Sequence, residues 1–171
     1  MAVLNIRKYP DPLLKRKSEP VKEITEELQR LIDDMAETMY AAPGVGLAAP
    51  QIGMLIRVIV IDINTRDEEK RELITLINPQ IVEQYGETLW EEGCLSVPDY
   101  STEVKRAVSV VVKGLDRYGE ETELKGEGLL SIVLQHEIDH LNGILFIDRL
   151  GLIKRDIIQR RLKKQAKVEA K

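Results

Sequence analysis

The chain contains only two histidines, and both lie in one short motif, HEIDH, at His136 and His140. On a helix, residues four apart share a face with Cβ atoms roughly 5–6 Å apart, so both imidazoles can reach one metal ion. Glu137 is rotated off that line, where its carboxylate can exchange protons with a water molecule instead of binding the metal. The motif therefore predicts a hydrolytic metal site.

The alternative is an exposed helix on which two histidines are spaced by four without function. The flanking segments LLSIVLQ and LNGILF are strongly apolar, which predicts that this helix is largely buried. Burying two imidazoles and two carboxylates without partners is costly, and a metal ion removes that cost. The flanks therefore favour the metal site over the exposed helix.

A catalytic metal site usually has three protein ligands and one open position. Because no histidine remains, the candidates are downstream carboxylates such as Asp148 and the only cysteine, Cys94. A free cysteine is most often a small buried hydrophobe. Its surroundings, WEEGCLSVPDY, nevertheless favour a shaped loop over a core strand, since Gly93 permits unusual backbone angles and Pro98 closes the segment. A thiolate there would complete a Cys/His/His set.

A third unusual stretch is GVGLAAPQIG, residues 44–53. It formally matches a dinucleotide-binding fingerprint, but a helix precedes it where a strand is required, and Pro50 would stop the helix that should follow. Two interpretations remain open: an ordinary glycine-rich turn, or a loop whose backbone approaches a ligand. Gln51 is the one polar side chain in the stretch, and its amide could donate a hydrogen bond to a developing oxyanion.

Hydrophobic periodicity predicts the elements that must position these residues. Residues 24–40 follow helical spacing, with Thr25 and two glutamates as the N-terminal signal. From residue 55 to about 125, three stretches carry β-branched strand signals, LIRVIVID, LITLINP and AVSVVVKGLD, with a hairpin turn within 114–119. Residues 126–143 return to helical spacing and end at Asn142 and Gly143, and a last helix begins near Ile153. We expect one α+β domain spanning residues 1–171, in which antiparallel or mixed sheets pack around the HEIDH helix between an N-terminal and a C-terminal helix.

Composition limits the function classes. The 171 residues carry a net charge of −4, 43% apolar residues and 32% charged residues, which is typical of a globular protein and gives no sign of DNA binding. The last segment, residues 154–171, is locally basic, with eight Lys/Arg against two acids. One cysteine suits a reducing compartment, and no segment resembles a leader or a membrane span. We therefore expect a cytoplasmic protein.

Together, GVGLAAPQ, EGCLSV and QHEIDH occur in the order found in peptide deformylases, and the chain resembles that family over nearly its whole length. The resemblance implies a hydrolase that removes the formyl group from the N-terminal formyl-methionine of new polypeptides, releasing formate. It implies that Cys94, His136 and His140 bind one ion, naturally Fe²⁺, for which Zn²⁺, Ni²⁺ or Co²⁺ can substitute. Glu137 would carry the proton, and Gln51 with the backbone N–H of Leu95 would stabilise the oxyanion.

The resemblance also implies a methionine pocket, for which plain core packing is the alternative at each position: Val45, Gly46, Trp90, Leu129, Ile132 and Val133. Glu92 and Arg106 are expected either to pair and support the cysteine segment or to be two exposed charges. Ser101 stands where well-known members of the family carry an arginine. The basic C-terminal helix either is simply solvated or docks on the ribosome, as C-terminal extensions do in relatives.

Two rival functions would use some of the same residues. A zincin-type protease would take a downstream carboxylate such as Asp148 as its third ligand, which leaves Cys94 and Gln51 without a role. A structural metal domain normally needs four protein ligands, and two histidines with one cysteine supply too few. The deformylase interpretation accounts for all three segments.

Overall fold

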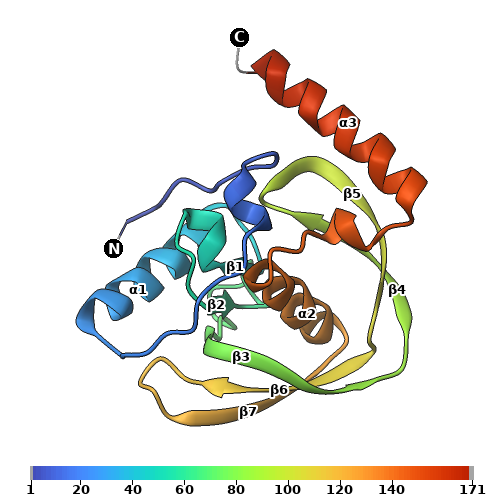
Figure 1. Cartoon of the computed structure of the whole chain (residues 1–171). Coiled ribbons are helices and arrows are strands. Elements are labelled where there is room, and N and C mark those ends of the chain that lie inside the picture. The colour runs from blue at the N-terminus through green and yellow to red at the C-terminus, as the bar shows by residue number, and fades with distance from the viewer. Residues whose placement is uncertain (1, 170–171) are drawn as a thin grey trace.

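The computed structural model describes residues 2–169 (Figure 1). It has three α-helices, α1 (Glu26–Ala41), α2 (Leu129–Leu141) and α3 (Leu152–Glu169), and three short 3-10 turns, η1 (Pro12–Lys15), η2 (Ala49–Ile52) and η3 (Phe146–Arg149). The strands are β1 (Gly46–Ala48), β2 (Val58–Ile61), β3 (Ile74–Tyr85), β4 (Thr88–Cys94), β5 (Val97–Arg106), β6 (Ser109–Leu115) and β7 (Glu121–Glu127). Strands β1-β2-β3-β6-β7 form one sheet in that order, and β4-β5 form a second. Every named pair is antiparallel, so the α+β prediction is confirmed in its antiparallel form.

Helix α2, which carries HEIDH, lies in the middle of the molecule with strands around it (Figure 1). Every residue from Ser131 to Leu141 is buried, because the helix is apolar on nearly all sides. Leu134, Ile138 and Leu141 pack in one cluster with side chains of β2 and β6. The helix ends at the expected pair: Asn142 is the C-cap, and Gly143 adopts φ 73°.

Helix α1 confirms the predicted N-terminal helix. The Thr25 hydroxyl accepts a hydrogen bond from the Leu28 N–H at 3.1 Å, which caps the first turn. Its apolar face, with Ile32, Met35 and Met39 fully buried, packs on β1 and β2. This packing supports the short strand β1, which lies beside α2 and leads directly into η2.

Two segments that were predicted as loops contain strands instead. Cys94 is the last residue of β4, and Val97 begins β5, so the cysteine sits at the turn of a long two-stranded ribbon with an irregular register between Gly93 and Cys94. The ribbon was missed because it is mostly polar and has few of the β-branched residues that mark strands. The glycine-rich stretch likewise contains β1, which pairs with β2, followed by η2.

Helix α3 leaves the body of the protein and projects outward at the C-terminal side (Figure 1). Only Ile158 and Leu162 are buried, and they pack near Phe146. Leu152, Ile153 and Ile157 are exposed among the lysines and arginines of the helix. Within residues 2–169, no helix combines the length and apolar character that crossing a membrane requires.

Candidate active site

The three predicted metal ligands converge although they come from two elements. Cys94 stands at the end of β4, and His136 and His140 lie one turn apart on α2. Their ligating atoms all lie within 4.8 Å of one another, and the Cys94 sulfur is 3.3 Å from Nε2 of His140. Thiolate and imidazole ligands together suit zinc, iron and related transition metals. The donor set therefore fits a single transition-metal ion.

Hydrogen bonds orient two of these ligands, His136 and Cys94. The Glu92 carboxylate lies 2.8 Å from Nδ1 of His136, which holds the proton on that nitrogen and leaves the Nε2 lone pair free. The Cys94 sulfur accepts from the Ser96 N–H at 3.4 Å and faces the Gln51 amide nitrogen at 3.7 Å. These two contacts fix the position of the sulfur beside the histidines, and the thiolate is the form of cysteine that binds metals.

The charges around the histidines also fit a cation. Burial lowers the pKa of His136, but the Cys94 sulfur and the Glu92 carboxylate outweigh it and raise that pKa well above its usual value. Burial, together with the positive charges of His136 and Arg106, lowers the pKa of His140 well below its usual value. Since histidine must be deprotonated to bind a metal, an ion at this site would displace the proton that the raised pKa of His136 favours.

Glu137 follows His136 on α2 and lines the same cavity as Cys94 and His136. Glu137 is 4% exposed, and its Oε1 atom has no hydrogen-bond partner within residues 2–169. Burial raises the pKa of Glu137 to about 7, against the lowering effect of the His136 charge. A carboxyl group with a pKa near neutrality is suited both to accept and to return a proton. An added Cβ on Gly46 would lie only 2.5 Å from Oε2, so the glycine makes room for this carboxylate.

Gln51 is fixed with its amide N–H₂ toward the sulfur. Its Oε1 accepts from the Ala48 N–H at 3.0 Å, and its Nε2 donates to the Ser96 hydroxyl at 3.1 Å. The side chain is almost fully buried, at 1% exposure. The glycine-rich stretch therefore approaches the site through Gly46 and Gln51, which favours the second of the two interpretations left open by the sequence.

A cavity of about 490 Å³ lies beside these groups. Its wall includes Gln51, Cys94, Leu95, His136 and Glu137 and all six predicted pocket residues, Val45, Gly46, Trp90, Leu129, Ile132 and Val133. The structure thus places them together, while their contact with a substrate stays a prediction. The lining also contains two exposed acids, Glu91 and Asp99, and no lysine or arginine from residues 2–169. Ser101 lies outside the lining and donates to Glu91 at 3.1 Å.

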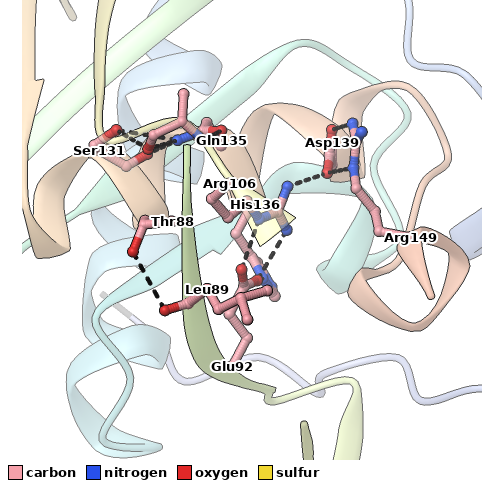
Figure 2. A network of polar contacts seen from close by, with 10 residues as sticks. Thr88, Leu89, Glu92, Arg106, Ser131, Gln135, His136, Asp139 and Arg149 are labelled. Atoms are coloured by element: carbon pink, nitrogen blue, oxygen red, sulfur yellow. Dashed lines mark hydrogen bonds and ion pairs between the residues drawn. The ribbon is translucent and has the colours of Figure 1, made fainter. Parts of the chain in front are cut away.

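Glu92 and Arg106 form the supporting pair and not two exposed charges (Figure 2). The guanidinium donates to both Glu92 oxygens, at 2.6 and 2.8 Å, and both residues are buried. Sequence reasoning missed Asp139, which accepts from Arg106 at 2.7 Å, and Arg149, which donates to both Asp139 oxygens. The only available signal for Asp139 was its place within HEIDH, three residues after His136.

Asp148, the rival third ligand, is engaged elsewhere. It accepts from the Leu145 N–H at 2.9 Å and pairs with Lys15. It is absent from the group of potential ligands that the described residues form around His136 and His140. The geometry therefore gives no support to a zincin-type ligand set.

The antiparallel fold, the Cys/His/His group and the buried glutamate beside a cavity define the chain as a metal-dependent hydrolase. A family model described as Polypeptide deformylase matches residues 3–156. The chain is 58% identical over 167 residues to the peptide deformylase of Syntrophobacter fumaroxidans, covering 98% of each chain. It matches a crystal structure of a peptide deformylase from Legionella pneumophila with a TM-score of 0.90 and 49% identity, covering 99% of each.

A further match is the peptide deformylase of Ehrlichia chaffeensis in complex with actinonin, with a TM-score of 0.89 and 40% identity over 96% of this chain and 98% of that one. The chain belongs to the polypeptide deformylase family, whose members remove the N-formyl group from nascent polypeptides. The resemblance read from the three motifs is confirmed.

Proposed function

We propose that this chain hydrolyses N-formylmethionyl peptides at the cavity beside Glu137, releasing formate and a free amino group. One observation carries the proposal. A Cys/His/His group and a buried carboxylate without a partner within residues 2–169 meet at the wall of an apolar cavity. This combination supplies a nucleophile, a proton carrier and a binding site for an apolar side chain in one place.

We assign Cys94, His136 and His140 as the ligands of one ion per chain. A divalent cation held there would activate water as a nucleophile near neutral pH and polarise a carbonyl group. We propose Fe²⁺ as the natural ion, with Zn²⁺, Ni²⁺ or Co²⁺ as substitutes. A mixed thiolate and imidazole set supports this choice, because it accommodates all four metals and does not suit Mg²⁺ or Ca²⁺.

Glu137 is proposed as the proton carrier. It accepts a proton from the attacking water and returns it to the amine nitrogen as the formyl C–N bond breaks. Water oxygen joins the formyl carbon, so the products are formate and the peptide amine. The unpartnered Oε1 leaves room for this exchange, and general acid–base catalysis of this kind contributes about 10²–10⁴-fold.

Gln51 and the backbone N–H of Leu95 are proposed as the donors to the formyl oxygen. The contact with Ala48 turns the Gln51 amide so that its N–H₂ faces the sulfur and the cavity. A donor fixed before the reaction stabilises the charge that develops on that oxygen without reorganising, and removing one such donor typically costs about 10²–10³-fold in kcat.

The methionine side chain is proposed to lie against the apolar part of the cavity. An unbranched thioether adapts to irregular apolar surfaces and favours contact with aromatic rings. The residues proposed to contact it are Val45, Trp90, Leu129, Ile132 and Val133, with Gly46 at the junction to Glu137. Trp90 remains 37% exposed, so a peptide can enter from its side.

We also propose that the chain acts in the cytoplasm on nascent polypeptides and docks on the ribosome through α3. The exposed lysines and arginines of this projecting helix support the idea, because ribosomal RNA is a polyanion. Electrostatic docking should weaken steeply as salt rises and should be lost when residues 154–171 are removed. Salt-independent binding, or binding without these residues, would contradict the proposal.

One assay separates the candidate functions. The iron- or nickel-loaded protein is incubated with a formyl-Met peptide and with the same peptide lacking the formyl group. Formate release from the first peptide, with no internal cleavage of either, is expected. Cleavage of the unformylated peptide would select the protease instead, and no product from either would favour a structural metal site.

A further inference from the structure

Four charged side chains, of Glu92, Arg106, Asp139 and Arg149, form one connected line beside the metal-site helix α2 (Figure 2). The His136 ring faces Glu92 at 2.8 Å, and Glu92 accepts twice from Arg106. Arg106 continues to Asp139 at 2.7 Å. Arg149 closes the line by donating from Nε at 2.8 Å and from Nη2 at 2.6 Å to the two Asp139 oxygens. The line thus runs from a candidate metal ligand to a residue outside the three family motifs.

The charges of these four side chains compensate one another within a largely buried cluster. Glu92, Arg106 and Asp139 are 5%, 4% and 6% exposed, whereas the Arg149 side chain is 43% exposed. Two carboxylates face two guanidinium groups, so their formal charges cancel only when Arg149 is present. A buried cluster that loses one partner retains an uncompensated charge, which is the costly case for buried ion pairs.

Arg149 also occupies a distinct place in the chain. It is the last residue of η3, and α3 begins three residues later at Leu152. Asp139 and His136 are one turn apart on α2, yet Asp139 faces Arg149 while His136 faces Glu92 (Figure 2). The contact therefore connects the start of the C-terminal segment to α2, one turn away from His136.

We propose that Arg149 is a positioning residue for the metal centre, which holds His136 in place through Asp139, Arg106 and Glu92. The inference rests on the proposed function, because it assumes that His136 binds the ion. Its physical basis is competition for Arg106. That guanidinium serves Glu92 and Asp139 at once, and it can hold both geometries only while Arg149 satisfies the rest of the Asp139 carboxylate.

Removing Arg149 leaves Oδ1 of Asp139 without its hydrogen-bond donor and gives the buried cluster a charge of −1. Arg106 is then drawn toward Asp139, and its two bonds to Glu92 loosen. Glu92 in turn no longer fixes the proton and the plane of the His136 ring. Groups that orient metal-bound histidines, as Glu92 does here, typically change metal affinity about 10–100-fold when mutated, and Arg149, three contacts beyond Glu92, should have a smaller effect.

The alternative is a purely structural role, in which Arg149 only fastens η3 to α2. Both roles predict a lower melting temperature for Arg149→Ala, so stability does not separate them. The kinetics and spectrum of a bound metal do, when measured well below the melting transition. Co²⁺ serves as the probe because a thiolate ligand gives it a charge-transfer absorption band, which reports the ligand geometry directly.

The test measures Co²⁺ release to an excess of chelator from four proteins: wild type, Arg149→Ala, Arg149→Lys and Arg160→Ala. Arg160 is the matched control, because it pairs with Asp156 in an exposed i,i+4 contact on α3 at 3.0 Å. Arg149→Ala should release the ion about 3–10-fold faster with a shifted cobalt spectrum, below the effect expected of a direct partner. Arg149→Lys should fall between it and wild type, because lysine keeps the charge without the two parallel bonds.

Release and spectra of Arg149→Ala that match wild type, with only its melting temperature lowered, would overturn the proposal. The route is tested by adding Asp139→Asn: the double variant should release cobalt no faster than Asp139→Asn alone, and additive effects would contradict transmission through Asp139. Wild-type protein that binds Co²⁺ without a thiolate band would instead overturn the Cys94 ligand, and with it the proposed function on which the inference rests.

Discussion

Replacing Gly46 with alanine should disable the proton carrier while leaving the metal ligands in place. The new Cβ would lie 2.5 Å from Oε2 of Glu137 and 2.9 Å from its Cγ and Cδ, much closer than carbon and oxygen atoms can approach. Gly46 is buried and pairs with Ile61 in the β1-β2 ladder, so the strand cannot retreat. The carboxylate must therefore move.

The size of the effect follows from that displacement. Restoring an ordinary contact needs a shift of the carboxylate of about 1 Å, and a misplacement of this size can cost about 10²-fold in rate. That loss corresponds to about 2.7 kcal/mol of transition-state stabilisation. Because the three atoms nearest the added methyl group all belong to Glu137 and none to a metal ligand, metal content should stay near one ion per chain.

The assay is kcat for a formyl-Met peptide, with metal content measured on the same sample. Gly151→Ala is the matched control, because a Cβ there meets no atom within 4 Å and its φ is not positive, so its kcat should equal that of wild type. If Gly46→Ala, fully metal-loaded, turned over at the wild-type rate, Glu137 would not need its present position and the reasoning would fail.

Three further predictions concern the same groups. Cys94→Ser should lose most of its metal on purification whereas Asp148→Asn retains it; equal metal contents would contradict the thiolate ligand. Glu92→Ala should weaken metal binding about 10–100-fold, measured by chelator competition, and an unchanged affinity would refute its supporting role. In metal-free protein the raised pKa of Glu137 stabilises the fold below the unfolded-state pKa, and this contribution is lost as pH rises toward about 7. As pH rises from 5 to about 7, the free energy of unfolding of Glu137→Gln, measured by denaturant unfolding, should therefore increase relative to wild type by up to about 3 kcal/mol; a difference that stays constant over this range would contradict the pKa shift.

The chemistry of the site was predictable because it depends on which residue types the chain contains. With only two histidines and one cysteine, the chain offers few transition-metal ligands, and the search for a third ligand led to Cys94. The helix periodicity around Leu134 and Ile138 is also a local property, so α2 and its end at Asn142 were predicted closely. The resemblance of the segments around Gln51 and Cys94 to the motifs of the family indicated the remaining site residues.

What could not be predicted depends on contacts between distant segments. Arg106 and Asp139 are 33 residues apart, and nothing in the spacing indicates that one guanidinium holds both Glu92 and Asp139. The need for a glycine at position 46 also depends on tertiary structure, because the Glu137 carboxylate, which comes from α2, leaves no room for a side chain there. The β4-β5 ribbon was missed because its polar strands form a separate two-stranded sheet and lack a simple apolar alternation.

The most direct test of the account is a paired measurement on Glu137→Gln: bound metal and formate release from the same purified sample. The glutamine keeps the size of the side chain but cannot carry the proton. We expect one ion per chain, as in wild type, with turnover reduced by about 10²–10⁴-fold. Loss of the metal together with activity would make Glu137 a ligand, and retained turnover would remove it from the reaction; either result would contradict the proposed mechanism.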